Sequence, residues 1–198
     1  MKRIALIAAT LALTCVAFAQ DNEIRRIPGV GSDSNQISLS TLESGFWMGT
    51  ELLGGSTLNL KTHNMGFTEA DVVAGYRFNQ YIKVGAGIGF RYYINQGCLR
   101  RPDIKWGFPL FVTARGNIIG STYRRVVPYW GVEAGGTIQD GLFFRPTIGL
   151  RVGEIRHAFI VGLSYMCQNI TQHKVEGDYT TKTYKYMSFL SLRLGYEF

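Results

Sequence analysis

The last residues of the chain alternate between apolar and mixed positions, and this alternation constrains the fold more than any other feature. Counted back from the end, every second position of 184–198 is apolar or aromatic apart from a single serine: Phe198, Tyr196, Leu194, Leu192, Leu190, Ser188 and Tyr186. The positions between them are mostly polar or small. A period of two predicts a β-strand with one apolar face and one mixed face.

Seven earlier segments alternate in the same way, and no stretch keeps an amphipathic helical pattern for three turns. The segments are about 42–53, 68–78, 81–93, 105–117, 126–138, 142–152 and 157–168. Most have the roughly 9–11 residues that a tilted strand needs to cross a bilayer. Together with 184–198 they predict eight strands.

The charged residues within these segments share the face that carries the glycines. They are Glu51, Arg77, Lys83, Arg91, Arg115, Glu133, Arg145, Arg151 and Arg193. An Arg or Lys that faces lipid near the midplane costs roughly 2–4 kcal/mol, so a whole set facing outward would be prohibitive. We therefore expect an all-β fold, an eight-stranded antiparallel up-and-down transmembrane β-barrel with the charged face inside and the aliphatic face on lipid.

Connection lengths and aromatic positions support a spanning barrel. Connections after the second, fourth and sixth segments are modest, whereas those after the first, third and seventh are longer, as in barrels with short inner turns and longer outer loops. Only the connection after the fifth segment, around Gln139-Asp140-Gly141, is short where a long one is allowed. Aromatic residues gather at segment ends, which is typical of the two bilayer interfaces. The predicted inner rim holds Phe78, Tyr81, Tyr123, Tyr129, Trp130, Tyr196 and Phe198, and the predicted outer rim holds Tyr92, Tyr93, Trp106, Phe108, Phe143, Phe144, Tyr165, Tyr184 and Tyr186.

The first residues predict export. Lys2 and Arg3 precede an apolar run over 4–18, and Ala17-Phe18-Ala19 matches a cleavage site, so 1–19 is expected to be a secretory signal peptide. The run is shorter than the ~20 residues of a membrane span, which disfavours a retained helix, and the residues before Cys15 fit a lipidation box poorly. Residues 20–41 are expected to form a flexible periplasmic leader, and 42–198 the barrel. Removal of Lys2 and Arg3 lowers the formal charge from +7 to +5, and the basic residues are spread out, so nucleic acid is not an expected partner.

These features, with the ending Leu192-Arg193-Leu194-Gly195-Tyr196-Glu197-Phe198, resemble the small eight-stranded outer-membrane barrels of OmpX-like proteins and of the OmpA-like transmembrane domain. The resemblance covers about 42–198. It implies a place in the outer membrane of a Gram-negative bacterium, contact with outer-membrane lipid and lipopolysaccharide, and recognition of Leu194, Tyr196 and Phe198 by the barrel-assembly machinery. A soluble lipocalin-like barrel is the alternative. Such a barrel would turn the apolar face inward, and it would not require so many glycines or aromatic residues at its rims.

The inward charges allow two interpretations. Seven basic residues accompany Glu51 and Glu133, with Asp71 and Glu197 nearer the strand ends. This set could form a narrow anion-favouring pathway, or a plug of ion pairs that holds the barrel together. Side chains just fill an eight-stranded barrel, which favours the plug. The excess of positive charge has no structural explanation at this level, and bound anions or water are candidates to balance it.

Catalytic chemistry is weakly supported. Some small barrels of this class are lipid A deacylases or acyltransferases with His and Ser near the outer rim, and only His63 or His173 in predicted outer loops could be fitted to that role. The glycines of 85–89 lie within a strand and lack the spacing of a nucleotide-binding loop. No Cys, His and carboxylate cluster has metal-ligand spacing, so we expect no metal, no cofactor and no enzyme activity.

The outer loops carry the remaining possibilities. Arg100, Arg101 and Lys105 could bind phosphates of lipopolysaccharide, although ordinary loop solubility explains them as well. Cys98 and Cys167 lie near the predicted outer rim and are expected to be free thiols. The leading hypothesis is a structural or surface-interaction protein whose function resides in the extracellular loops. A small anion-favouring pore is the alternative, and a lipid A-modifying enzyme is less favoured. Ligand, conductance and oligomeric state stay open.

Overall fold

A computed structural model describes residues 44–58, 65–95, 105–120, 125–138, 140–154, 157–176 and 179–198, and the statements below refer to these residues. They form strands β1 (Gly45–Thr57), β2 (Gly66–Arg77), β3 (Lys83–Ile94), β4 (Trp106–Gly107), β5 (Pro109–Asn117), β6 (Val126–Thr137), β7 (Leu142–Gly153), β8 (Ala158–Glu176) and β9 (Tyr179–Glu197). In the described part of the chain, no helix is long and apolar enough to cross a membrane.

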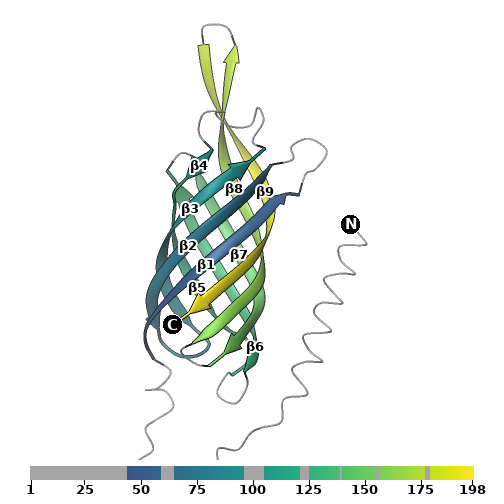
Figure 1. Cartoon of the computed structure of the whole chain (residues 1–198). Coiled ribbons are helices and arrows are strands. Elements are labelled where there is room, and N and C mark those ends of the chain that lie inside the picture. Colours follow the sequence, from purple (N-terminus) through teal and green to yellow (C-terminus); the bar gives the residue numbers. More distant parts are fainter. Residues whose placement is uncertain are drawn as a thin grey trace, which may run out of the picture.

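The strands form one closed antiparallel sheet (Figure 1). Its order is β2-β1-β9-β8-β7-β6-β5-β3, and the pairing of β2 with β3 closes the ring. The short strand β4 continues β5 in the same register, since β3 pairs Tyr92 with Trp106 and Ile88 with Leu110. Pro109 lies at the interruption and has no N–H for the ladder. Because β4 and β5 together occupy one strand position, the barrel has eight strand positions, which we call staves. The predicted eight-stranded antiparallel barrel is confirmed.

Burial separates the two faces as the alternation predicted. Outward side chains such as Phe46 and Ile148 are 72% and 69% exposed, whereas the inward Arg91 and Arg193 are both 0% exposed. Apolar side chains thus cover the outside of the barrel, and charged ones lie in the lumen. This arrangement is the reverse of a soluble lipocalin-like barrel, which excludes that alternative.

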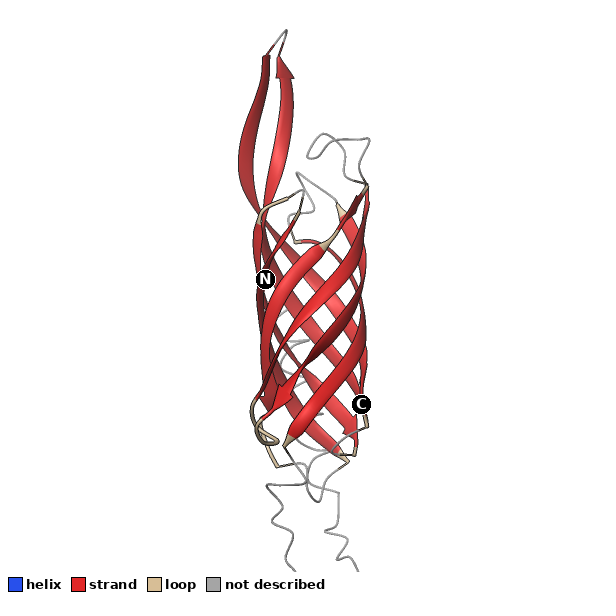
Figure 2. Cartoon of the chain, turned by 90° about the vertical axis from the view of Figure 1, so that its left-hand side faces the viewer, coloured by secondary structure: helices blue, strands red, loops and turns tan. Residues whose placement is uncertain are grey.

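The last two strands are longer than predicted. β8 runs to Glu176 and β9 begins at Tyr179, so 169–183 forms most of a β-hairpin where a loop was expected. Figures 1 and 2 show this hairpin extending well beyond the rim of the barrel. Residues 171–174 are all polar, so the sequence there loses the alternation by which the other strands were predicted. We call the end of the barrel that carries this hairpin the ribbon end, and the opposite end, with connection 78–82, the basal end.

Three predicted rim aromatics lie inside the barrel. Tyr93, Tyr129 and Phe143 are all buried, which corrects their assignment to the girdles. The reason is parity, because side chains two residues apart lie on the same face of a strand. Tyr93 is two residues from the inward Arg91, and Phe143 is two residues from the inward Arg145, so both face the lumen. Other predicted rim aromatics are exposed. They are Phe78, Tyr81 and Phe198 at the basal end, and Tyr92, Trp106, Phe108, Phe144, Tyr165 and Tyr186 toward the ribbon end.

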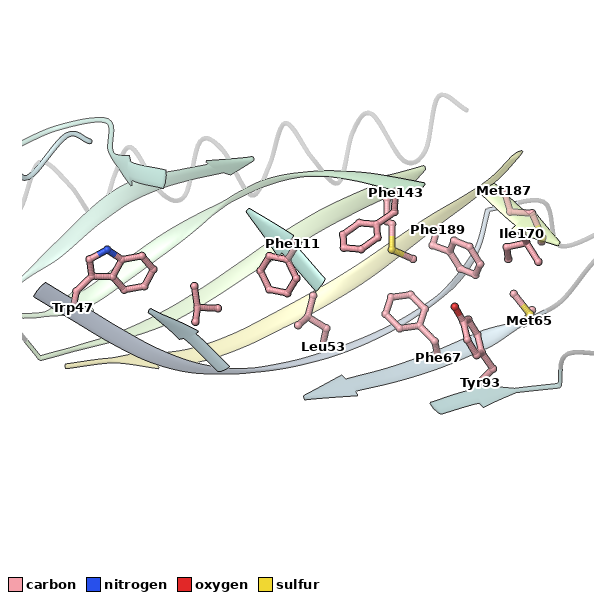
Figure 3. Close-up of a cluster of buried hydrophobic side chains, with 12 residues drawn as sticks. Trp47, Leu53, Met65, Phe67, Tyr93, Phe111, Phe143, Ile170, Met187 and Phe189 are labelled. Atoms are coloured by element: carbon pink, nitrogen blue, oxygen red, sulfur yellow. The ribbon is translucent and has the colours of Figure 1, made fainter. Parts of the chain in front are cut away.

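An apolar cluster shares the lumen with the charges (Figure 3). It comprises Trp47, Leu53, Met65, Phe67, Val73, Tyr93, Phe111, Phe143, Met166, Ile170, Met187 and Phe189. Phe67 and Phe189 pack edge to face, with ring centroids 5.5 Å apart. The mixed strand face was predicted to carry charged and small residues, and the sequence did not show that its apolar members form a cluster. It fills lumen space that would otherwise need water.

Candidate functional site: the charged lumen

The centre of the lumen is organised around Glu133 of β6. Its carboxylate accepts hydrogen bonds from Arg115 Nη2 at 2.8 Å and Arg145 Nε at 2.5 Å. Arg193 of β9 donates to the same carboxylate through Nη1 at 2.5 Å and Nη2 at 2.6 Å. Glu51 of β1 pairs with Arg115 and, at 2.9 Å, with Arg193. Residues from five staves are therefore tied together across the barrel axis.

Toward the ribbon end, the network continues through β2. Arg145 donates to Glu69 Oε1 at 2.8 Å and to Asp71 Oδ2 at 2.9 Å. Arg91 pairs with the other oxygen of Glu69 and also donates to Gln168. These contacts connect β7, β2, β3 and β8 without a break.

Residues in and beside the short connection between β6 and β7 form hydrogen bonds with this end of the network. The Tyr93 hydroxyl donates to Asp140 Oδ2 at 2.8 Å, and Gln168 Nε2 donates to Thr137 Oγ1 at 3.2 Å. Asp140 is itself buried, although it belongs to a connection. The connection thus contributes a carboxylate to the lumen.

A second, smaller cluster lies at the basal end. Lys83 pairs with Glu197, and Arg151 Nε lies 3.2 Å from Glu197 Oε2. Arg151 also donates to the backbone oxygen of Glu154 at 2.8 Å. Arg77 is buried at the same end of β2.

Aromatic rings sandwich the guanidinium groups. The Cζ atom of Arg145 lies 5.3 Å from the ring centroid of Phe111 and 5.4 Å from that of Phe143. Arg91 lies 5.2 Å from the Phe67 centroid, and Arg115 lies 5.1 Å from Trp47. Such desolvated cation–π contacts stabilise by up to about 2 kcal/mol each. They also hold the guanidinium planes in place, so the apolar cluster and the ion pairs form one packed unit.

All nine predicted lumen residues are inward and buried, and the structure adds acidic partners that the sequence analysis omitted or placed at strand ends. Glu69 was missed, although it shares the parity of Asp71 and Arg77 on β2. The buried charges are seven basic (Arg77, Lys83, Arg91, Arg115, Arg145, Arg151 and Arg193) and six acidic (Glu51, Glu69, Asp71, Glu133, Asp140 and Glu197). The difference is 7 − 6 = 1 among the described residues, so most of the unexplained positive charge is balanced by carboxylates.

Some candidates fall elsewhere. Arg100, Arg101, His63 and Cys98 lie outside the described residues, as do the expected signal peptide and leader. Lys105 is exposed beside Trp106 at the ribbon end, and Cys167 carries a free thiol. No group of His, Cys, Asp and Glu in the described ranges could hold a metal ion.

The predicted assembly residues Leu194 and Tyr196 share the outer face of β9, and Phe198 follows directly after the strand ends. Leu194 and Phe198 are 48% and 46% exposed, and Tyr196 is half-buried. The Phe198 backbone completes the seam with β1 by exchanging hydrogen bonds of 2.9 and 3.0 Å with Met48. Their recognition by assembly machinery stays a prediction.

Comparison with family models and with curated proteins found no match. Among solved structures, Neisserial surface protein A (NspA) has 14% identity and a TM-score of 0.48, over 78% of this chain and 96% of that one. The N-terminal β-barrel domain of Pseudomonas aeruginosa OprF has 14% identity and a TM-score of 0.42, over 78% and 99%. Outer membrane protein AlkL, solved in DMPC lipid bilayers, has 16% identity and a TM-score of 0.44, over 88% and 95%.

These are likenesses of fold, and the barrel itself rests on the strand pairing described above. In the described residues, the chain is a closed eight-stranded antiparallel barrel, apolar outside and charged inside.

Proposed function

We propose that the protein is a non-enzymatic surface-interaction protein of the bacterial outer membrane. In this proposal the barrel is the membrane anchor, and the hairpin formed by the ends of β8 and β9 is the element that meets a partner outside the cell. The observation that carries the proposal is the length of this hairpin beyond the barrel (Figure 2).

The hairpin leaves the barrel as a free two-stranded ribbon. Pairing of β8 with β7 ends at Gln168, and pairing of β9 with β1 ends at Phe189. The two strands then pair only with each other in the described structure, from Ile170↔Lys185 to Glu176↔Tyr179. These are 176 − 169 = 7 pairs, which at about 3.4 Å per residue extend the ribbon by about 24 Å. A ribbon with two open edges can accept an added strand by backbone hydrogen bonding.

The lumen supports an anchor better than a pore. An anion pathway needs cations that face water, whereas the buried Arg115, Arg145 and Arg193 each contact carboxylates. The apolar cluster, which includes Phe67 and Phe189, occupies lumen space beside them. Both features favour a packed interior over a hydrated one.

The test uses full-length protein in lipid nanodiscs as bait for a phage-displayed library of random extended peptides. A variant in which an Asn-Gly turn replaces 171–184 removes the ribbon beyond the Ile170↔Lys185 pair and keeps the barrel strands, including the buried Ile170. We expect enriched peptides to bind the intact protein and to lose binding to this variant. Equal binding to both proteins, or no enrichment on the intact protein, would contradict the proposal.

Planar-bilayer recording separates the anchor from the pore. We expect no steady conductance. A steady anion-selective conductance that Arg91→Gln or Arg151→Gln abolishes would favour the pore instead.

A further inference from the structure

The outer wall of the barrel is hollowed along β1 and β2. One groove of about 460 Å³ and another of about 630 Å³ adjoin there, and both are lined by Leu52, Ala70 and Leu194. The first groove reaches Tyr92, the second reaches Tyr196, and the two adjoin at Leu52, Ala70 and Leu194. We call this surface the outer trough.

Residue size creates the outer trough. Its lowest parts are formed by small outward residues of β1 and β2, namely Thr50, Gly54, Thr68 and Ala70, while Leu52, 62% exposed, projects between Thr50 and Gly54 where the two grooves adjoin. Larger outward side chains rise on either side, with Leu192 and Leu194 on β9 and Phe90 and Tyr92 on β3. Strand registers place these rows side by side, since Gly54 pairs with both Leu192 and Thr68, and Thr68 pairs with Tyr92.

Polar groups lie at one end of this apolar trough. Thr68 and Ser56 are outward and exposed, and their hydroxyls have no hydrogen-bond partner among the described residues. They are diagonal neighbours across β1 and β2, because Ser56 pairs with Gly66 and Gly54 with Thr68. A hydroxyl in an apolar environment is stabilised when it donates a hydrogen bond, so an oxygen atom of a bound ligand would stabilise these two groups.

The position of these hydroxyls matches a membrane interface. Thr68 is the register partner of Tyr92, which belongs to the exposed aromatic row toward the ribbon end. Thr68 therefore lies about 5 Å, one strand spacing, from a residue type that marks the level of lipid headgroups. Ester and amide linkages of membrane lipids lie at this depth, and their acyl chains run from there toward the midplane.

We propose that the outer trough holds one acyl chain of lipid A, with the carbonyl of its ester or amide linkage accepting hydrogen bonds from Thr68 and Ser56. The proposal rests on the orientation proposed above, in which the ribbon end faces the cell exterior and hence the lipopolysaccharide leaflet. Lys105 extends the site. The backbone oxygen of Lys105 accepts a hydrogen bond from the N–H of Tyr93 on β3 at 2.6 Å. Because β3 lies between Lys105 and β2, Lys105 is two strand spacings, about 10 Å, from β2. Its exposed ammonium can meet a phosphate of the same lipid.

Strand tilt disfavours a second copy of the barrel as occupant. Strands in such barrels tilt by about 35–45°, and two copies that share a membrane normal show this tilt with opposite sign at a face-to-face contact. A ridge of one copy would cross the trough of the other at about 70–90°, so it could touch the trough only locally. A flexible acyl chain can follow the part of the trough that runs from Thr68 toward the midplane.

The experiment is native mass spectrometry of the full-length protein in detergent, titrated with lipid A or with phosphatidylethanolamine. Ala70→Phe fills the floor of the trough. Ala134→Phe is the matched control, because Ala134 is an exposed outward alanine on β6, outside the trough. A double variant, Ser56→Ala with Thr68→Val, removes the hydroxyls and leaves the shape. Heat-dependent gel mobility verifies that each variant is folded.

We expect one lipid A per wild-type protein, bound at least tenfold more tightly than phosphatidylethanolamine. Ala70→Phe should weaken this binding at least tenfold, the double variant about five- to tenfold, and Ala134→Phe not at all. Equal retention by the wild type, Ala70→Phe and Ala134→Phe would show unspecific annular lipid and overturn the proposal. Equal binding of the two lipids would also overturn it. The assay does not depend on the ribbon, so a negative result leaves the proposed surface interaction intact.

Discussion

Glu133 contacts three guanidinium groups, from Arg115, Arg145 and Arg193, so neutralising it is the most direct test of the lumen network. Glu133→Gln keeps the size of the side chain and removes its charge. Removing one partner of a buried ion pair costs about 3–5 kcal/mol.

The structure predicts that the cost of Glu133→Gln lies near the lower end of this range. Arg115 and Arg193 retain Glu51, Arg145 retains Glu69 and Asp71, and the glutamine carbonyl still accepts a hydrogen bond. We therefore expect the free energy of unfolding to fall by about 3 kcal/mol. At about 1.4 kcal/mol per factor of ten, this is roughly a 140-fold change in the unfolding equilibrium.

The measurement is urea unfolding of the barrel in lipid vesicles, followed by tryptophan fluorescence. Glu154→Gln is the control, because Glu154 is an exposed carboxylate at the basal rim. We expect it to stay within about 0.5 kcal/mol of the wild type. A Glu133→Gln barrel as stable as this control would refute the inference that ion pairs hold the barrel together.

The same unfolding assay tests the packing of the inner and outer faces. A Cβ atom at Gly89 would lie 1.9 Å from Asp71 Oδ1, so Gly89→Ala should displace Asp71 from Arg145 and cost about 1–3 kcal/mol. Gly54→Ala meets no atom within 4 Å and should change stability by less than about 0.5 kcal/mol; equal effects would contradict the close packing of Gly89. Ile148→Arg, in the middle of β7 and 69% exposed, should cost about 2–4 kcal/mol in a bilayer. Ile138→Arg, just beyond the end of β6, should cost only about 0–1 kcal/mol, and equal costs would show that the outer wall does not face lipid.

The face of each strand could be predicted from the sequence because the parity of side chains is a local property. Ile88 is 54% exposed and Arg91 is fully buried, as alternation along one strand requires. The same rule, applied consistently, would also have placed Glu69, Tyr93 and Phe143 in the lumen. The two aromatics lie near strand ends, where height in the barrel suggests a rim, but their parity places them in the lumen, as it does Glu69.

The partners of the lumen charges could not be predicted in this way. Arg193 and Glu51 are 142 residues apart, and Arg145 and Asp71 are 74 apart. Whether two such residues meet depends on the stagger of the closed sheet and on their heights along its axis, which no local pattern determines. The β8–β9 ribbon was not predicted because the sequence over 171–174 is uniformly polar and does not alternate.

The balance of lumen charges bears directly on the choice between anchor and pore. An anion pathway requires a clear excess of basic over acidic residues in the lumen. Glu69, Asp71, Asp140 and Glu197 bring the described set to seven basic and six acidic residues, and Asp140 comes from a connection that no strand pattern covers. The described lumen therefore lacks the large excess of basic residues that an anion pathway requires. The charges instead explain how an eight-stranded barrel can be packed to its centre, which gives the ribbon a rigid base.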